Sequence, residues 1–242
     1  MSVQAPRVSL VIPCRNESSR LPATLQALEA FLDPQTEVVI VVEKSVDNTA
    51  QLAHDAARKD PRIRVIENPV GRGKGFAVKT GMLAAAGNVI FFMDADLSVP
   101  LRFILQFLAV LDRDEADIVI GSRRHRESVI PRSQPLLRVV YGRIFNLCLR
   151  LLGATRFKDT QCGFKAFRRE AARDVFSRLT LDGFGFDVEA LALAEKAGYR
   201  IVDHPVEWSD APGSKVSALR DGTSSFFEAV LAARRARGKN AS

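Results

Sequence analysis

The stretch Val89-Ile90-Phe91-Phe92-Met93-Asp94-Ala95-Asp96 is the most informative part of this 242-residue chain. Its first five residues are all apolar, which predicts a buried strand with both faces covered, as in a parallel sheet. Two carboxylates, Asp94 and Asp96, follow directly, and their spacing places both on the same side of the chain. The sequence therefore predicts a buried strand that delivers a pair of acidic side chains to one edge of a sheet.

Further strands and helices alternate around this strand. Compact apolar runs predict strands at residues 8–12, 38–42, 63–66, 89–93 and 118–120. Helical spacing predicts helices at residues 18–31, 46–59, 73–86 and 100–111, and again at 136–152 and 222–237. The pattern at 160–208 is mixed and less regular. This order predicts an α/β fold with a single doubly wound, mostly parallel sheet flanked by helices, a mixed C-terminal part, and ligands beyond the carboxyl ends of the strands.

Composition narrows the classes of function. A hydrophobic content of 47% supports a real core, and a net charge of +7 suits an anionic partner such as a nucleotide or a phospholipid surface. No nucleic-acid-binding module is recognisable, so we expect no nucleic-acid partner. Three cysteines without CxxC spacing argue against a disulfide framework or a zinc site. We expect no signal peptide and no membrane span, and hence a cytoplasmic protein.

Polar segments follow several of the predicted strands. A divalent cation fits Asp94 and Asp96, because Mg²⁺ and Mn²⁺ prefer oxygen ligands; helix capping is the alternative. The segment Gly71-Arg72-Gly73-Lys74-Gly75 offers flexible backbone and cations at a helix start, which suits a phosphate, although a solvated turn would look the same. Residues 13–17 and 43–47 follow the first two strands, where a nucleoside would lie or where they would simply cap helices.

The ordered series of motifs resembles the family-two glycosyltransferases of the GT-A fold. The later segments look like the dolichyl-phosphate β-glucosyltransferase branch: Gly121-Ser122-Arg123, Asp159-Thr160-Gln161-Cys162-Gly163-Phe164-Lys165, Phe186-Asp187-Val188-Glu189, Val206-x-Trp208 and Gly213-Ser214-Lys215. Polyprenyl-phosphate mannosyltransferases are similar, but less so at residues 186–189. The resemblance covers residues 8–220. One departure is Glu43-Lys44-Ser45, where the family has Asp-Asp-Gly-Ser.

The resemblance implies a role for each matching position. It implies donor binding by Pro13, Arg15, Glu17, Glu43, Lys74, Asp94 and Ala95. It implies a Mg²⁺ or Mn²⁺ ion held by Asp94, Asp96 and Ser98, and acceptor binding by Arg123, Arg138, Gln161 and Lys165. The implied catalytic residues are Asp94, Asp96, Arg123 and Asp187. Asp187 would act as a base, bind sugar hydroxyls or orient Lys165.

The implied reaction is an inverting transfer of a hexose, glucose from UDP-glucose, to a polyprenyl or dolichyl phosphate. Open alternatives are mannosyl transfer from GDP-mannose, a family-two enzyme with a soluble acceptor, a sugar-1-phosphate nucleotidylyltransferase and a non-catalytic binding module. We predict a glycosyltransferase domain at 1–220, with a nucleotide-sugar-binding half at 1–121 and an acceptor-binding half at 122–220. An amphipathic basic helix and tail would follow at 221–242.

Two apolar-basic segments suggest contact with a membrane surface. Residues 136–147 carry arginines among leucines, valines and isoleucine, and Phe226-Phe227 precedes a second group of arginines. Such helices can lie in the headgroup region with arginines on lipid phosphates. We therefore expect peripheral contact with an anionic membrane at its cytoplasmic face; a helix that packs on the core or forms an oligomer is the alternative.

Overall fold

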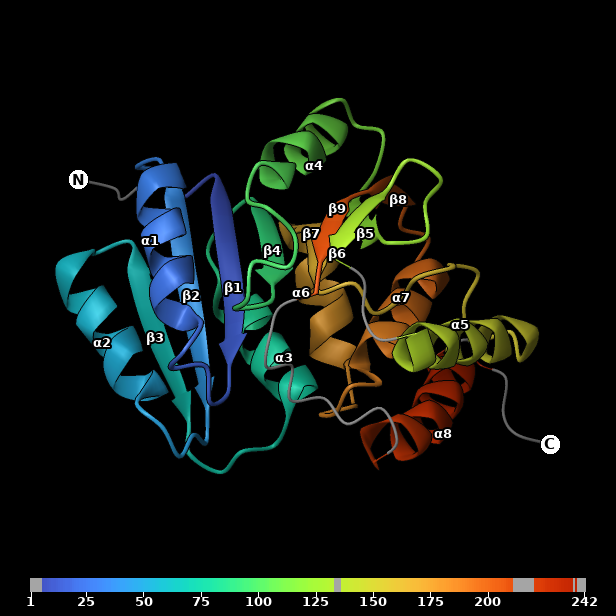
Figure 1. Cartoon of the computed structure of the whole chain (residues 1–242). Helices are drawn as coiled ribbons and strands as arrows, with labels where there is room; N and C mark the ends of the chain where they lie inside the picture. Colours follow the sequence, from blue (N-terminus) through green and yellow to red (C-terminus); the bar gives the residue numbers. More distant parts are fainter. Residues whose placement is uncertain (1–5, 133–135, 211–219, 237, 239–242) are drawn as a thin grey trace.

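The structure, a computed structural model, describes residues 6–132, 136–210, 220–236 and 238. A seven-stranded sheet in the order β3-β2-β1-β4-β7-β5-β8 forms the centre of the molecule (Figure 1). The strands are β1 Val8–Cys14, β2 Thr36–Glu43, β3 Ile63–Asn68, β4 Val89–Met93, β5 Ile118–Ser122, β7 Phe164–Arg168 and β8 Ile201–Pro205. Only β7 runs antiparallel to its neighbours in this sheet. The expected mostly parallel α/β sheet is confirmed.

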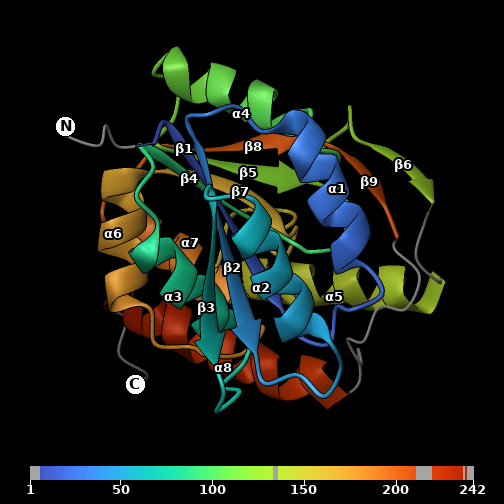
Figure 2. The same cartoon turned by 90° about the vertical axis from the view of Figure 1, so that its left-hand side faces the viewer.

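Helices cover both faces of the sheet (Figures 1 and 2). Their bounds are α1 Leu21–Phe31, α2 Thr49–Lys59, α3 Lys74–Ala84, α4 Phe103–Asp112, α5 Leu136–Leu151, α6 Arg169–Arg178, α7 Phe186–Lys196 and α8 Arg220–Ala236. One apolar cluster packs the sheet against α1, α2 and α4, and a second packs the opposite face against α3, α6 and α7 and includes residues of α5 and α8. A short separate pair, β6 Val129–Arg132 and β9 Glu207–Ser209, completes the fold.

The strand β4 lies in the middle of the sheet, and every one of its residues is buried. Alternation directs successive side chains to opposite faces. Phe92 meets Phe186 of α7 on one face, with ring centroids 5.6 Å apart, and Phe91 meets Phe107 of α4 on the other, at 6.2 Å. Since both faces are apolar, the carboxylates that follow β4 are the first side chains of this segment that can reach solvent.

Several predicted boundaries differ from the structure by a few residues, and two of these differences have a visible physical cause. The first strand was predicted to end at residue 12, yet β1 continues through Pro13 to Cys14. Because β1 pairs with β4 only over residues 8–11, the absence of a backbone N–H at Pro13 is tolerated there. The helices α1, α2 and α4 each begin three residues later than predicted. In the first two cases the preceding polar residues bind each other instead: Asp47 accepts hydrogen bonds from Ser18 and Thr49.

None of the helices in the described ranges is long and apolar enough to cross a bilayer.

Candidate active site

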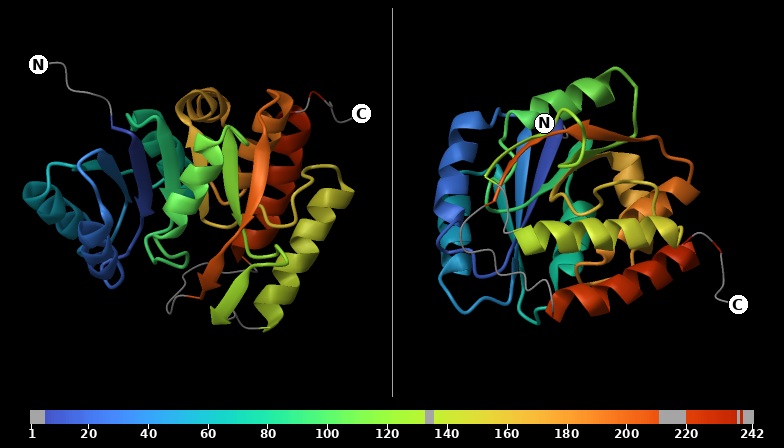
Figure 3. Two further views of the ribbon diagram at one scale, coloured as in Figure 1. Left: turned by 90° about the horizontal axis from the view of Figure 1, so that it is seen from above. Right: turned by 45° about the vertical axis from the view of Figure 1, so that its right-hand side comes forward.

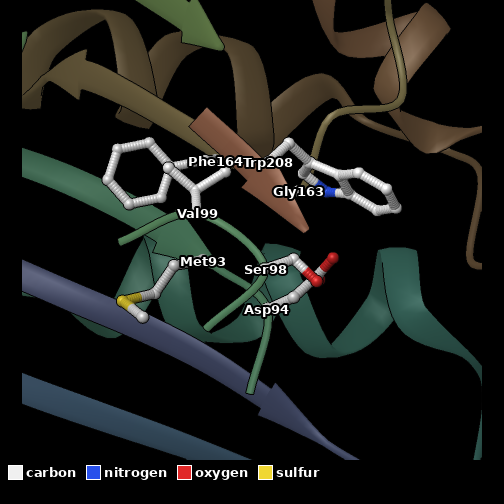
Figure 4. Close-up of a pocket in the computed structure, with 7 residues that line it drawn as sticks. All are labelled: Met93, Asp94, Ser98, Val99, Gly163, Phe164 and Trp208. Carbon is white, nitrogen blue, oxygen red and sulfur yellow. The ribbon is translucent and has the colours of Figure 1, made fainter. Parts of the chain in front are cut away.

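Asp94 leaves β4 at the carboxyl edge of the sheet, where β7 brings a second segment beside it. The backbone N–H of Asp94 donates to the carbonyl of Gly163 over 3.0 Å. A Cβ on Gly163 would lie 1.9 Å from Oδ2 of Asp94, so the carboxylate rests directly against a residue that has no side chain. These residues line a pocket together with Ser98 and Trp208 (Figure 4). The absence of a side chain at residue 163 is therefore a requirement for this position of Asp94.

The turn after Asp94 is fixed by local hydrogen bonds. The Ser98 backbone N–H donates to Oδ1 of Asp96 over 3.0 Å, and the Thr24 hydroxyl donates to the Ala95 carbonyl over 2.7 Å. A guanidinium nitrogen of Arg20 lies 3.9 Å from Oδ2 of Asp96. Asp96 is thus oriented by backbone and held near a cation, and Ala95 contributes its backbone to the turn.

These residues fit a hard divalent cation. Asp94 and Asp96 present carboxylate oxygens with side chains 34% and 19% exposed, and both already attract a cationic side chain. The described part of the chain holds no cluster of three or more His, Cys, Asp or Glu side chains suited to a metal. Mg²⁺ and Mn²⁺ commonly bind through one or two carboxylates plus substrate phosphates, so two carboxylates at this edge are a sufficient protein contribution.

Lys74 approaches Asp94 from the start of α3. Its Nζ lies 2.6 Å from Oδ1 of Asp94, and burial, which would lower the pKa of Lys74, is outweighed by Asp94 and Asp187, so the pKa is raised. The preceding Gly73 has φ of 127° and donates its N–H to Oε2 of Glu43 over 3.1 Å. The glycine-lysine turn therefore delivers a protonated ammonium group to the acidic turn after β4.

Glu43 is buried and binds groups of the protein itself rather than facing the pocket. Its side chain is almost fully buried, and one oxygen accepts from Gly73 while the other accepts from the Asn68 amide. Glu43 thereby fixes the backbone that precedes Lys74. Its predicted contact with the donor nucleoside stays a prediction.

The end of β1 contributes Pro13 to the same edge, and the loop after it contributes Arg15 and Glu17. Pro13 is partly buried in β1, and Arg15 is exposed. Glu17 accepts two hydrogen bonds from Arg20, over 2.6 and 2.7 Å. Arg20 in turn approaches Asp96, so Glu17 positions a cation beside the acidic turn. The sequence reasoning missed Arg20; its spacing of three residues from Glu17 was the available signal.

Arg123 follows β5 and forms an ion pair with the fully buried carboxylate of Asp159. Its Nε and Nη2 donate to the two oxygens of Asp159 over 2.8 and 2.7 Å, and its backbone N–H donates over 2.9 Å. Burial alone would raise the pKa of Asp159, but the charge and hydrogen bonds of Arg123 hold it at about 2. The guanidinium carbon lies 5.4 Å from the centre of the Trp208 ring. Asp159 thus fixes the Arg123 cation over Trp208, which is one of the residues that line the pocket of Figure 4.

Lys165 lies inside the molecule rather than on the surface of the site. Its side chain is 1% exposed, and Nζ donates to the Cys162 carbonyl over 2.7 Å and to Oδ1 of Asp187 over 2.5 Å. Because β7 lies within the sheet, alternation turns Lys165 toward α7, and Nζ is 4.8 Å from the Phe92 ring centre. As placed, Lys165 does not line the site. Of the three roles considered for Asp187, the structure matches the partner of Lys165.

The remaining predicted residues are placed only in part. Gln161 is half-buried in the segment that leads from Asp159 to β7. Arg138 lies in α5, but its side chain falls outside the described residues, as does the whole of Gly213-Ser214-Lys215.

The charged groups form one electrostatic cluster. Asp94 contributes to the raised pKa of Lys74 and, on the other side, to the raised pKa of Arg123. Asp187 responds to burial first, which raises its pKa, and then to Lys165 and Lys74. Lys74 and Arg123 are therefore both held by acidic partners, and the charge of Asp94 acts on both of them.

Comparison with known proteins places this arrangement in a family. Residues 9–176 match the family described as glycosyl transferase family 2. Dolichyl-phosphate beta-glucosyltransferase of Drosophila melanogaster is 35% identical over 226 residues, which cover 87% of this chain and 69% of the relative. A Trichomonas vaginalis enzyme of the same name is 33% identical over 86% of this chain and 65% of its own length. The chain thus spans about two thirds of these relatives.

A solved structure agrees with the fold. Glucosyl-3-phosphoglycerate synthase from Mycobacterium tuberculosis, crystallised with Mn²⁺, uridine diphosphate and glucosyl-3-phosphoglycerate, superposes with a TM-score of 0.70 over 98% of this chain and 82% of that chain. The sequence identity is 18%, so this likeness supports the fold alone. The motif order, the sheet and the family match lead to one conclusion: this chain is a glycosyltransferase and belongs to glycosyl transferase family 2.

Proposed function

We propose that this enzyme transfers glucose from UDP-glucose to the phosphate of a polyprenol or dolichol, with inversion at the anomeric carbon. One observation carries the proposal: Lys74 pairs with Asp94, and Arg123, held by Asp159, lies over Trp208, so two cations contact residues that line one pocket. Two phosphate-bearing substrates need two such cations. The names of the relatives in Drosophila and Trichomonas support glucose and dolichyl phosphate.

On the donor side, Lys74 binds the diphosphate and neutralises the charge that develops as the nucleotide leaves. Asp94 and Asp96, with Ser98 beside them, would hold Mg²⁺ or Mn²⁺; the bound ion supplies Lewis-acid stabilisation of the departing diphosphate. Complexes of the mycobacterial synthase with Mn²⁺ or Mg²⁺ and uridine diphosphate support this choice of cofactor and nucleotide. Pro13 and Arg15 border the nucleoside.

On the acceptor side, Arg123, Arg138 and Gln161 bind the phosphate group. A phosphate monoester is already a nucleophile near neutral pH, so positioning and electrostatics supply most of the catalysis. Its oxygen attacks the anomeric carbon in line with the leaving diphosphate, which inverts the configuration. Asp187 is buried against Lys165 and acts here as a positioning residue.

The direct test offers radiolabelled UDP-glucose and polyprenyl phosphate with Mg²⁺ or Mn²⁺. We expect a radioactive product that extracts into organic solvent and is lost when EDTA is added. Parallel reactions with GDP-mannose and with water-soluble acceptors test the two nearest alternatives. Label that moves only to a soluble acceptor, or only from GDP-mannose, would contradict the proposal.

The surface of α5 supports a peripheral location on an anionic membrane, which we place at its cytoplasmic face. Large apolar side chains project from α5 at helical spacing and are 42–79% exposed: Leu136, Val140, Ile144, Leu147 and Leu151. The helix contains arginines but no acidic residue. Helix α8 lies beside it (Figure 3), with Phe226 packed 5.4 Å from Phe145 and Phe227 exposed. Apolar side chains with flanking arginines suit insertion between anionic headgroups.

Vesicle flotation tests this location. Wild-type protein should float with phosphatidylglycerol vesicles, and the variant Ile144→Glu, Leu147→Glu should remain in the soluble fraction. Leu105→Glu is the matched control, because Leu105 is 61% exposed on α4, across the sheet from α5. Equal flotation of the α5 variant and the control would contradict membrane contact through α5.

A further inference from the structure

The ammonium group of Lys74 already occupies one side of the proposed cation site. It lies 2.6 Å from Oδ1 of Asp94, and the two side chains are 22% and 34% exposed. Because Asp94 is one of the two carboxylates that the described part of the chain places for a divalent ion, Lys74 neutralises half of the charge that such an ion would use. The chain's own lysine is therefore a tethered competitor for the site.

The backbone that carries Lys74 is held on several sides. Gly73 donates its N–H to Glu43, and Phe76 donates its N–H to the Asp182 carbonyl over 3.1 Å. A Cβ on Gly75 would lie 2.5 Å from the Leu181 carbonyl oxygen, so this turn of α3 packs closely on residues 181–183. The backbone around Lys74 is therefore fixed, whereas the flexible four-carbon side chain can move its ammonium group from Asp94 to another anion.

We infer that Lys74 and the divalent cation compete for Asp94, and that a nucleotide diphosphate relieves the competition by taking the Lys74 ammonium as its own partner. The inference rests on the proposed function only in that the site accepts a nucleotide diphosphate with a divalent ion. Without nucleotide, the ion meets a carboxylate already paired and a nearby like charge. With nucleotide, Lys74 moves to the diphosphate and Asp94 is released.

This exchange makes ion binding and nucleotide binding mutually reinforcing. A coupling between two sites is reciprocal, so each ligand must raise the affinity of the other by the same factor. The free enzyme would then retain the ion weakly and hold it firmly only when a donor is present. The enzyme would select a nucleotide diphosphate together with its metal ion.

Calorimetric titration with Mn²⁺, with and without uridine diphosphate, tests the exchange. Lys74→Met should bind Mn²⁺ about tenfold more tightly than wild type when nucleotide is absent. Lys74→Arg keeps the charge and should retain weak binding. Uridine diphosphate should raise the Mn²⁺ affinity of wild type by about 10- to 100-fold, and of Lys74→Met by clearly less.

Lys79→Met is the matched control. It removes the same charge from the same helix, but Nζ of Lys79 donates to the Leu179 carbonyl over 2.7 Å and takes no part in the acidic turn. Its Mn²⁺ affinity should equal that of wild type. Equal or weaker Mn²⁺ binding by Lys74→Met without nucleotide, or the same gain in Lys79→Met, would overturn the inference; Lys74→Gln repeats the test if the Met variant does not fold. The titrations need neither sugar nor acceptor, so their outcome is independent of the proposed transfer reaction.

Discussion

Replacing Lys165 with methionine should destabilise the folded protein by about 3–5 kcal/mol at pH 8. The side chains of Lys165 and Asp187 are 1% and 7% exposed, and Nζ of Lys165 bonds both to Asp187 and to the Cys162 carbonyl. Methionine fills a similar volume, so the cost comes from the carboxylate that loses its cation. This is a large part of the roughly 5–15 kcal/mol that holds a typical domain folded.

The loss should depend on pH in a defined direction. Burial already raises the pKa of Asp187, against the opposing charges of Lys165 and Lys74, and removing Lys165 raises the pKa further. A carboxyl group whose folded pKa exceeds its unfolded value favours the folded state below about pH 3.9, and that advantage disappears as the pH rises through the folded pKa. The deficit of Lys165→Met should therefore be small near pH 4.5 and grow by up to about 1.4 kcal/mol per pH unit above it.

Guanidinium chloride unfolding at pH 5 and pH 8 measures this difference, and thermal unfolding at pH 8 should show a midpoint lowered by roughly 6–20 °C. The double variant Lys165→Met, Asp187→Leu removes both charges and should recover most of the loss, because an apolar pair can replace a buried ion pair. A deficit below about 1 kcal/mol at pH 8, or the same deficit at both pH values, would refute the account of this pair.

Three further variants test other parts of the site. Gly163→Ala should lower kcat/KM by at least about tenfold, because the new Cβ displaces the Asp94 carboxylate. The control is Gly183→Ala, whose added Cβ would meet nothing within 4 Å. Its kcat/KM should match that of wild type at each Mn²⁺ concentration tested. Asp94→Ala should reduce transfer by about 100-fold or more with an unchanged circular dichroism spectrum; unfolding or normal turnover would contradict its role. The lowered pKa of Asp159 contributes about 2 kcal/mol to the free energy of unfolding of wild type above pH 4, and this contribution is lost as the pH falls toward the Asp159 pKa of about 2. Asp159→Asn should lack this contribution, which acid unfolding of the two proteins would measure.

The sequence was sufficient for most of the sheet and for the position of Asp94. Runs such as Val89–Met93 are apolar at every residue, and that pattern has few structural solutions. It was insufficient for β7, which enters between β4 and β5 from a segment some 70 residues after β4 and runs antiparallel to both. Hydrophobic periodicity is local and does not report which strands pair.

The partners of charged residues were equally beyond the sequence. Arg123 and Lys165 were both selected as contacts for the acceptor, yet the structure gives Asp159 to the first and Asp187 to the second. In the first pair Arg123 lies over Trp208, which lines the pocket, whereas the second pair lies in the interior. Whether a strand residue such as Lys165 faces the interior depends on where its strand lies in the sheet and on the alternation of side chains along it. For Lys165 both are set by the position of β7 beside β4.

The departure at Glu43-Lys44 bears on whether the chain is a catalyst or only a binding module. The longer carboxylate of Glu43 spans from β2 to the Gly73 N–H and the Asn68 amide, so it fixes the turn that carries Lys74. Lys44 packs on the same turn, because a Cβ on Gly71 would lie 2.9 Å from the Lys44 Cβ. Both changed residues thus support the segment that places an ammonium on Asp94. The departure at Glu43-Lys44 therefore accompanies a turn that still places Lys74 on Asp94, and it does not by itself favour a binding module without catalysis.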